Sequence, residues 1–113
     1  MKRINLPETS GLYKCLLFEI RSEDLYLRIG DKEYYHWVIA MDFSKEANLA
    51  DSEWEPRNGE KVRGGAYVEI NLENRTMLFI GRSGDYGDID QEKAMKSLIG
   101  TGFSIEFYEY SPA

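Results

Sequence analysis

The chain has 113 residues, of which 42% are hydrophobic, 13% aromatic and 30% charged, a composition typical of a folded protein and not of a disordered one. Its 14 lysines and arginines stand against 20 aspartates and glutamates, so the net charge is −6 at pH 7. An acidic chain without a basic cluster repels phosphodiester backbones and anionic membranes, and we expect neither a nucleic-acid partner nor a membrane partner.

Cysteine content and apolar runs narrow the class of protein further. The single cysteine, Cys15, excludes a disulfide within the chain and a zinc site built from cysteines. The longest apolar run, residues 16–18, is far shorter than the roughly 18 residues of a membrane span, and no apolar stretch follows the charged start at residues 1–7. The sequence therefore predicts one domain over residues 1–113, a cytoplasmic location, and no cofactor or metal.

Alternating apolar residues predict a sheet of about six strands. The predicted strands are residues 11–21, 25–29, 34–40, 61–71, 75–81 and 103–110. The first strand is apolar on both faces, which is typical of a central strand. Turns at residues 30–32 and 72–74 indicate hairpins between the second and third strands and between the fourth and fifth. In the last strand, alternation places Phe103, Ile105 and Phe107 inward.

The better of two predicted helices covers residues 88–99. Asp88 and Gln91 form a capping-box pattern at its start, and Gly100 ends it. The predicted buried stripe consists of Ala94, Met95, Leu98 and Ile99, and Glu92 is predicted to pair with Lys96 at i,i+4.

A second helical pattern covers residues 44–54, with Ser44 as the N-cap and Pro56 as the stop. Residues 51–60 read as a polar loop. The order of strands and helices predicts an α+β fold, a single domain in which two helices cover a mixed or antiparallel sheet of about six strands.

The segment at residues 81–87, Gly-Arg-Ser-Gly-Asp-Tyr-Gly, leaves a predicted strand and leads to a predicted helix. Its three glycines let backbone N–H groups point into one concavity, to which a serine hydroxyl and an arginine add further donors. This loop, from Gly81 to Gly87, is therefore predicted to bind phosphate or another oxyanion. The predicted ligands are Arg82, Ser83, Gly84 and Asp85. One alternative is an ordinary connection in which the acidic residues cap the helix, and another is a hard-cation site at those residues, although their spacing does not match an EF-hand loop.

Two side chains outside the loop are candidates for phosphate chemistry. His36 is the only histidine, and imidazole is the side chain whose pKa suits general-base or nucleophilic work near neutral pH. Lys14 lies in the apolar first strand, where its ammonium needs either a path to solvent or an anionic partner. We predict His36 as the catalytic residue and Lys14 as a phosphate ligand, with structural roles for both as the alternative.

Taken in order, these segments resemble the janus/ocnus family, whose members include protein phosphohistidine phosphatases. Residues 11–14, Gly-Leu-Tyr-Lys before an aliphatic run, are similar to that family's first strand, and residues 62–65, Val-Arg-Gly-Gly, are similar to its glycine-rich strand start. The residues that match the family's Gly-Tyr-Ser-Met-Ala-Tyr-Gly loop are Gly81, Ser83, Tyr86 and Gly87. The resemblance spans nearly the whole chain.

The resemblance implies a phosphohistidine phosphatase-like protein whose partner is phosphate, another oxyanion or a phosphorylated protein. It implies that Ser83 and the loop amides hold the phosphate, that Lys14 assists, and that one histidine is the general base or the transient phosphate acceptor. The family's histidine follows a tyrosine at the end of a strand, just before the first helix. Tyr35 and His36 form such a pair.

Three positions depart from the family's pattern. An ungapped comparison puts Ile39 at the place of the catalytic histidine, Ala66 replaces the arginine after the glycines, and Asp85 replaces a small neutral residue. A second hypothesis therefore stays open, a non-enzymatic domain of the same fold that binds an anion or a protein. The position of His36 distinguishes the two hypotheses: His36 facing the loop within hydrogen-bond reach of Ser83 favours catalysis, and His36 on the opposite face does not.

Overall fold

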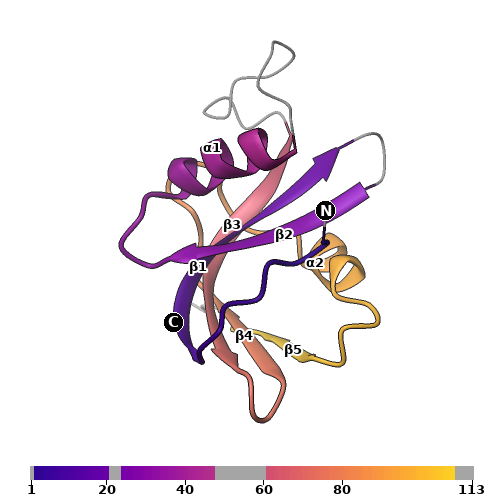
Figure 1. Ribbon diagram of the computed structural model, residues 1–113. Coiled ribbons are helices and arrows are strands. Elements are labelled where there is room, and N and C mark those ends of the chain that lie inside the picture. Colours follow the sequence, from indigo (N-terminus) through magenta and orange to yellow (C-terminus); the bar gives the residue numbers. More distant parts are fainter. Residues whose placement is uncertain (1, 21–23, 48–60, 109–113) are drawn as a thin grey trace, which may run out of the picture.

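The computed structural model describes residues 2–20, 24–47 and 61–108 and contains five strands and two helices within them. In chain order the elements are β1 (Gly11–Ile20), β2 (Asp24–Asp31), α1 (His36–Glu46), β3 (Val62–Asn71), β4 (Thr76–Ile80), α2 (Gln91–Ser97) and β5 (Ser104–Phe107). The strands form one sheet in the order β2-β1-β3-β4-β5 (Figure 1). All neighbours are antiparallel except β4 and β5, which are parallel. The predicted α+β class is confirmed, with five strands in place of about six.

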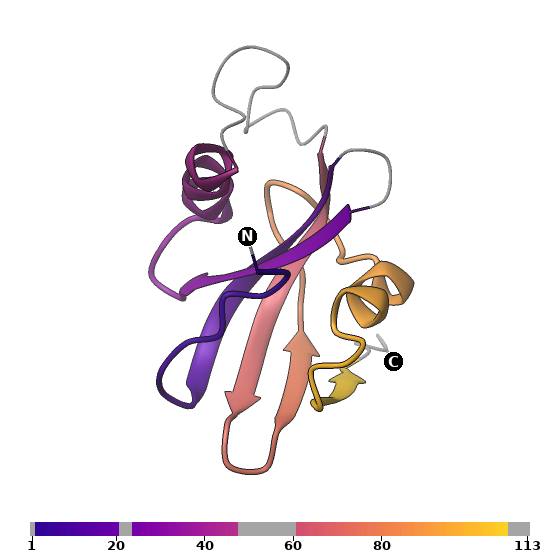
Figure 2. The ribbon, with the colours of Figure 1, turned by 45° about the vertical axis from the view of Figure 1, so that its right-hand side comes forward.

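The two helices lie on opposite sides of the sheet, as Figure 2 shows, so β1, an internal strand between β2 and β3, is covered on both faces. The residues packed on the side of α1, here called the α1-side core, are Leu16, Phe18, Ile20, Ile39, Ala40, Phe43, Ala47 and Val62. The α2-side core is Cys15, Leu17, Leu27, Ile29, Ala66, Val68, Ile70, Met77, Phe79, Ile89, Ala94 and Leu98. The prediction that the first strand lies inside the sheet with both faces covered is confirmed, although Leu12 at its start is exposed.

The predicted third strand at residues 34–40 is wrong, and the hairpin predicted around residues 30–32 is wrong with it. After β2 the chain turns at Asp31, whose carbonyl accepts a hydrogen bond from the Tyr34 N–H at 3.0 Å. α1 then begins at His36 and carries the chain across the sheet.

α1 forms in a stretch rich in aromatic residues because its apolar residues recur at helical spacing. The residues that it delivers to the α1-side core are Ile39, Ala40 and Phe43, with Ala47 just after it. The helix predicted over residues 44–54 therefore begins too late: Ser44 is buried inside α1 and donates its hydroxyl to a carbonyl of the helix instead of capping it. Residues 48–60, with Pro56 and the loop predicted at 51–60, lie outside the described residues.

α2 is shorter than predicted, and its N-cap is Asp90 rather than Asp88. The Asp90 carboxylate accepts a hydrogen bond from the Lys93 N–H at 3.0 Å, which satisfies one of the free donors of the first turn. The predicted ion pair between Glu92 and Lys96 is confirmed at 3.9 Å, on the exposed side of the helix.

The buried stripe of α2 is narrower than predicted. Ala94 and Leu98 are buried, as expected, but Met95 and Ile99 are 53% and 79% exposed. With only two turns, α2 reaches the sheet along one line of side chains, and residues beside that line stay in solvent. The chain leaves the helix through Gly100, whose φ of 84° lies in the left-handed region that ends many helices.

The remaining strands follow the predictions closely. β3 and β4 form the predicted hairpin around residues 72–74, with Asn71 opposite Thr76 at the turn. In the last strand the partly buried residues are Phe103, Ile105 and Phe107, and the exposed ones are Ser104, Glu106 and Tyr108. Residues 109 and 110 of that predicted strand lie outside the described residues.

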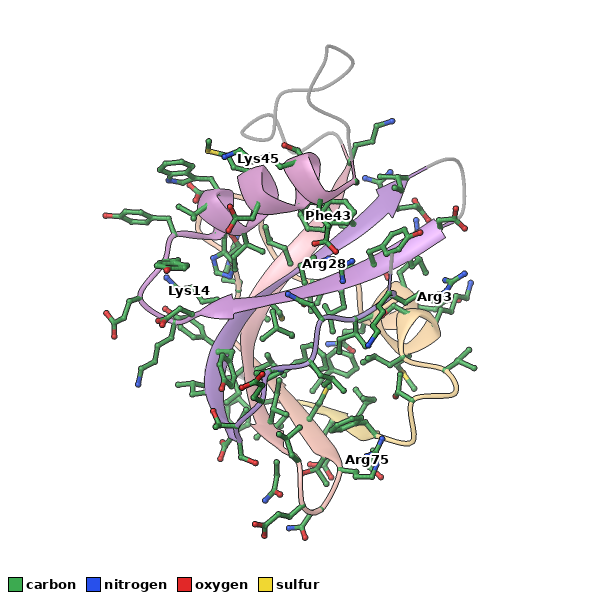
Figure 3. All side chains as sticks on the ribbon, in the orientation of Figure 1. Arg3, Lys14, Arg28, Phe43, Lys45 and Arg75 are labelled. Atoms are coloured by element: carbon green, nitrogen blue, oxygen red, sulfur yellow. The ribbon has the colours of Figure 1, made fainter. Side chains whose placement is uncertain are left out.

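β2 contains a buried arginine that the sequence analysis did not predict. Arg28 is 2% exposed and lies against Phe43, with its guanidinium carbon 5.2 Å from the ring centroid (Figure 3). It donates to the Lys2 carbonyl at 2.7 Å and lies 3.4 Å from the Glu46 carboxylate, so it joins the N-terminal segment and the end of α1 to the sheet. Burial lowers the pKa of Arg28, and the negative charge of Glu46 opposes that shift.

Glu19 links β1, β3 and α2. Its carboxylate accepts hydrogen bonds from Lys93 Nζ at 2.8 Å and from Arg63 Nε at 3.0 Å. The hydrogen bond from Lys93 lowers the pKa of Glu19 most; partial burial opposes it, and Arg63 adds to the lowering. The charged form of Glu19 is therefore the form that the fold favours.

We expect the free energy of unfolding of Glu19→Gln to fall less steeply at acidic pH than that of wild type. Because the folded pKa of Glu19 is lowered from 4.5, its charge stabilises the fold above that value and the contribution is lost as the pH falls below it. Urea denaturation between pH 6 and pH 3 measures the free energy of unfolding of both proteins, and the curve of the variant should be flatter below about pH 4.5. Glu73→Gln, a change in the exposed β3–β4 turn, is the control. Equal slopes for wild type and Glu19→Gln would contradict the expectation.

Candidate functional site

The loop at residues 81–87 is fastened to the start of β3. The Gly65 N–H donates to the Gly87 carbonyl at 3.1 Å, and the Ser83 N–H donates to the Gly65 carbonyl at 3.1 Å. A side chain at Gly64 would overlap the Asp88 carbonyl oxygen, and one at Gly65 would lie 3.0 Å from the Ser83 Cβ. The glycine pair thus lets the loop lie against the start of β3 in direct backbone contact.

Ser83 holds the loop together from within. It has no exposed surface, and its Oγ accepts hydrogen bonds from the N–H groups of Asp85 at 3.2 Å and Tyr86 at 3.1 Å. The Gly87 N–H donates to the Ser83 carbonyl at 2.9 Å. The amides of residues 83, 85, 86 and 87 are therefore bonded within the protein, whereas Gly84 is exposed.

His36 is the first residue of α1 and is 6% exposed. Its Nε2 lies 3.1 Å from the Ala66 carbonyl oxygen, and its ring meets the Tyr67 ring edge-on with centroids 6.3 Å apart. A carbonyl accepts and does not donate, so Nε2 carries the proton in the neutral ring. Nδ1 is then the nitrogen that can accept a proton.

The surroundings of His36 favour its neutral form. Burial lowers its pKa most, the hydrogen bond to Ala66 raises it, the positive charge of Lys14 lowers it, and the negative charge of Asp85 raises it. The net pKa lies below the ordinary 6.5. His36 is therefore a free base at neutral pH, influenced by two of the residues that the sequence selected, Lys14 and Asp85.

Lys14 lies in β1 directly opposite Tyr67 and points to the β2–α1 connection (Figure 3). Its Nζ donates to the Tyr34 carbonyl at 2.5 Å and lies 5.9 Å and 5.7 Å from the ring centroids of Tyr35 and Tyr67. These contacts leave the ammonium without a carboxylate partner among the described residues. It is a positive charge set between two aromatic rings and next to the start of α1.

The start of α1 adds partial positive charge to the same place. Its N-cap residue, Tyr35, makes no side-chain hydrogen bond to the first turn, and that turn contains no acidic residue. A helix start without a capping side chain leaves backbone N–H groups that attract an anion. Sequence reasoning missed this feature because it placed residues 34–40 in a strand. It also missed Tyr67, the residue after Ala66, whose ring contacts the ring of His36.

Arg82 belongs to a different part of the surface. Its Nε lies 3.8 Å from the Asp88 carboxylate, and in the part of the chain that the structure describes it forms no ion pair or hydrogen bond with Lys14 or His36. It borders an open cavity of about 670 Å³ at the ends of β4 and β5. The residues that line the cavity are Phe79, Ile80, Gly81, Arg82, Asp88, Ile89, Gln91, Phe107 and Tyr108. Neither His36 nor Lys14 lines this cavity.

At two of the positions that depart from the janus/ocnus pattern, the side chain points into a core and away from Lys14 and His36. Ile39 is 5% exposed and packs against Gly30 in the α1-side core, so it does not occupy a catalytic position. Ala66 points its side chain into the α2-side core, and only its carbonyl reaches His36. The third departure, Asp85, is exposed and close enough to His36 to influence its pKa.

Comparison with models of protein families found no match to this chain, and a search of curated proteins found no significant match either. Neither described helix is long and apolar enough to span a bilayer. Within residues 2–20, 24–47 and 61–108, no three His, Cys, Asp or Glu side chains gather in a way that could hold a metal ion.

Proposed function

We propose that this chain is a phosphohistidine phosphatase-like hydrolase of the janus/ocnus type, with His36 as the general base and Lys14 as the main phosphate ligand. The observation that carries the proposal is the placement of His36. It is held by Ala66 in one tautomer, with a lowered pKa, at an uncapped helix start beside an ammonium. The Tyr35–His36 pair at the start of α1 also agrees with the place of the family's histidine just before its first helix.

In the proposed reaction a water molecule attacks the phosphorus of a phosphohistidine while the P–N bond breaks. His36 Nδ1 takes a proton from the water and returns it to the leaving imidazole nitrogen, so the products are histidine and inorganic phosphate. Lys14 stabilises the charge on the phosphoryl oxygens.

The proposed phosphate ligands are fewer than the sequence predicted. Lys14 and the first-turn N–H groups of α1 are the main ones, and from the loop we add only Gly84, because it is exposed. Ser83 acts mainly by shaping the loop, because its hydroxyl and the amides that it binds are engaged with each other. Arg82 contributes long-range positive charge from the neighbouring cavity.

A non-enzymatic domain that binds an anion or a protein is the second candidate. Asp85 favours it, because a carboxylate near His36 repels a phosphate dianion and weakens the cradle. Both candidates share the binding site and differ in turnover alone. A cytoplasmic location is part of both, since a reduced buried thiol and an acidic surface suit that compartment.

The test is to titrate the protein with inorganic phosphate while backbone amide resonances are recorded, and to assay phosphate release from free phosphohistidine. We expect shifts at residues 36–38 and at Gly84. Lys14→Met should weaken phosphate binding by about 1–3 kcal/mol, as for the loss of a charged hydrogen bond. Lys45→Met, an exposed lysine at the other end of α1, is the matched control and should bind as wild type does.

Phosphate binding together with turnover would support the hydrolase. Binding without turnover would reject the hydrolase in favour of the second candidate. The site itself would be rejected if neither α1 nor residues 81–87 showed amide shifts. Equal phosphate affinities for the two lysine variants would reject it as well.

A further inference from the structure

The side of the sheet that carries α1 is only half covered. α1 packs on β1, β2 and the start of β3, and in the part of the chain that the structure describes no helix lies over β4 and β5 on that side (Figure 2). Because side chains alternate along a strand, this open face presents residues of the same parity as Lys14 and Tyr67. In cross-strand order its nearest row is Lys14, Tyr67 and Ile80, and the next is Leu12, Glu69, Leu78 and Glu106.

The second row contains a groove of about 300 Å³. It is lined by Glu69, Asn71, Thr76, Met77, Leu78, Ser104 and Glu106. Leu78 pairs with Glu69 on one side and with Glu106 on the other, so a half-buried leucine lies between two exposed carboxylates. Neither carboxylate forms an ion pair with any described residue.

An apolar floor between two carboxylates complements a lysine or arginine side chain. The aliphatic part of such a side chain would cover Leu78, and its cationic end would reach Glu69 or Glu106. The net charge of −6 favours a basic partner over an acidic one at long range. A lysine or arginine side chain offers both an apolar stem for the leucine and a positive charge for the carboxylates.

We propose that this groove, with Glu69, Leu78 and Glu106, binds a basic side chain of the polypeptide that carries the phosphoryl group. The inference depends on the proposed function only for where the phosphoryl group binds; the groove itself is argued from its own residues. Glu69 lies two residues along β3 from Tyr67, so the groove is roughly 7–15 Å from Lys14 and His36, a span of about two to five residues of extended chain. A substrate peptide would cross the open face with its phosphohistidine at Lys14 and a lysine or arginine in the groove.

The experiment uses two short peptides of glycine and serine with one central histidine. One carries a lysine four residues from the histidine, and the other carries a glutamate there. Both are assayed after chemical phosphorylation with phosphoramidate. We expect kcat/KM to be about three- to twentyfold higher for the lysine peptide at low salt, as for exposed ion pairs.

Glu69→Gln combined with Glu106→Gln should bring this ratio to within about twofold, while hydrolysis of free phosphohistidine stays unchanged. The control variant, Asp42→Asn with Glu92→Gln, also removes two negative charges, here from α1 and α2, outside the groove. It should keep the wild-type ratio of kcat/KM between the two peptides. A ratio near one in wild type, or the same ratio in both double variants, would overturn the proposal.

The proposal can also be tested without turnover. If no phosphopeptide is hydrolysed, the proposed function fails. Amide shifts on addition of the unphosphorylated lysine peptide then decide whether the groove binds a basic side chain. Shifts at residues 69, 78 and 106 that weaken with salt would support it, and their absence would overturn it. A change of oligomeric state in Glu69→Gln with Glu106→Gln would assign the face to a second copy of the chain and would overturn it as well.

Discussion

Gly64→Ala is expected to destabilise the fold by about 3–5 kcal/mol, since it combines a strained backbone with a steric overlap. Gly64 has a φ of 90°, and a Cβ there would lie 2.6 Å from Ile89 Cα and would overlap the Asp88 carbonyl. Neither neighbour is a flexible side chain, so the segment that follows the loop at residues 81–87 must move. Urea denaturation followed by far-ultraviolet circular dichroism measures the loss.

Two other glycines separate the causes of that loss. Gly100 has a φ of 84° but nothing within 4 Å of a built Cβ, so Gly100→Ala should cost only about 1–2 kcal/mol for the backbone conformation. Gly84 has open space and no positive φ, so Gly84→Ala should change stability by no more than about 0.5 kcal/mol. A loss at Gly64 no larger than the loss at Gly100 would mean that Asp88 and Ile89 do not press on the start of β3.

Most of the sheet could be predicted because period-two alternation is a strong signal where one or both faces are buried. β1, β3 and β4 lie within one residue of the predicted ends, and the inward residues of β5 are the predicted ones. The parallel pairing of β5 with β4 could not be predicted. A short alternating strand reads the same in either direction, and only tertiary contacts choose its partner.

α1 was mispredicted for a physical reason that can be named. Residues 34–39, Tyr-Tyr-His-Trp-Val-Ile, are aromatic or β-branched and have high strand propensity. The competing signal was the spacing of Ile39, Ala40, Phe43 and Ala47, which is helical and extends further along the chain. Tertiary burial of that stripe under β1 and β2 outweighs local propensity.

The candidate site was predicted in its members more than in its arrangement. Lys14 and His36 were selected by residue type, and the structure brings them together through the positions of β1 and α1. Ser83 was selected for its hydroxyl, but its burial and its internal hydrogen bonds depend on the glycine pair of β3, which no local pattern reveals. The uncapped start of α1 was hidden by the wrong assignment of its first residues.

His36→Ala is expected to lower the rate of phosphohistidine hydrolysis by about 10²–10⁴-fold, the usual loss on removal of a general base. Phosphate binding, measured by amide shifts, should persist because Lys14 and the start of α1 remain. The control is His36→Gln, whose amide N–H can still donate to the Ala66 carbonyl while it lacks a titrating base. It should lose activity as His36→Ala does but should retain more stability, because the Ala66 carbonyl keeps a donor.

The dependence on pH adds a second readout for His36. Since burial holds its folded pKa below 6.5, the neutral base persists and activity should begin to fall only below about pH 6.5. In the unfolded chain His36 takes up a proton near pH 6.5, whereas the folded chain does so only at lower pH. Folding therefore favours the neutral form, and the contribution of His36 to stability is present above about pH 6.5 and lost as the pH falls through the lowered pKa. The difference in free energy of unfolding between wild type and His36→Gln should shrink between pH 7 and pH 5. If His36→Gln hydrolysed phosphohistidine with the same dependence on pH as wild type, His36 would have no part in the mechanism.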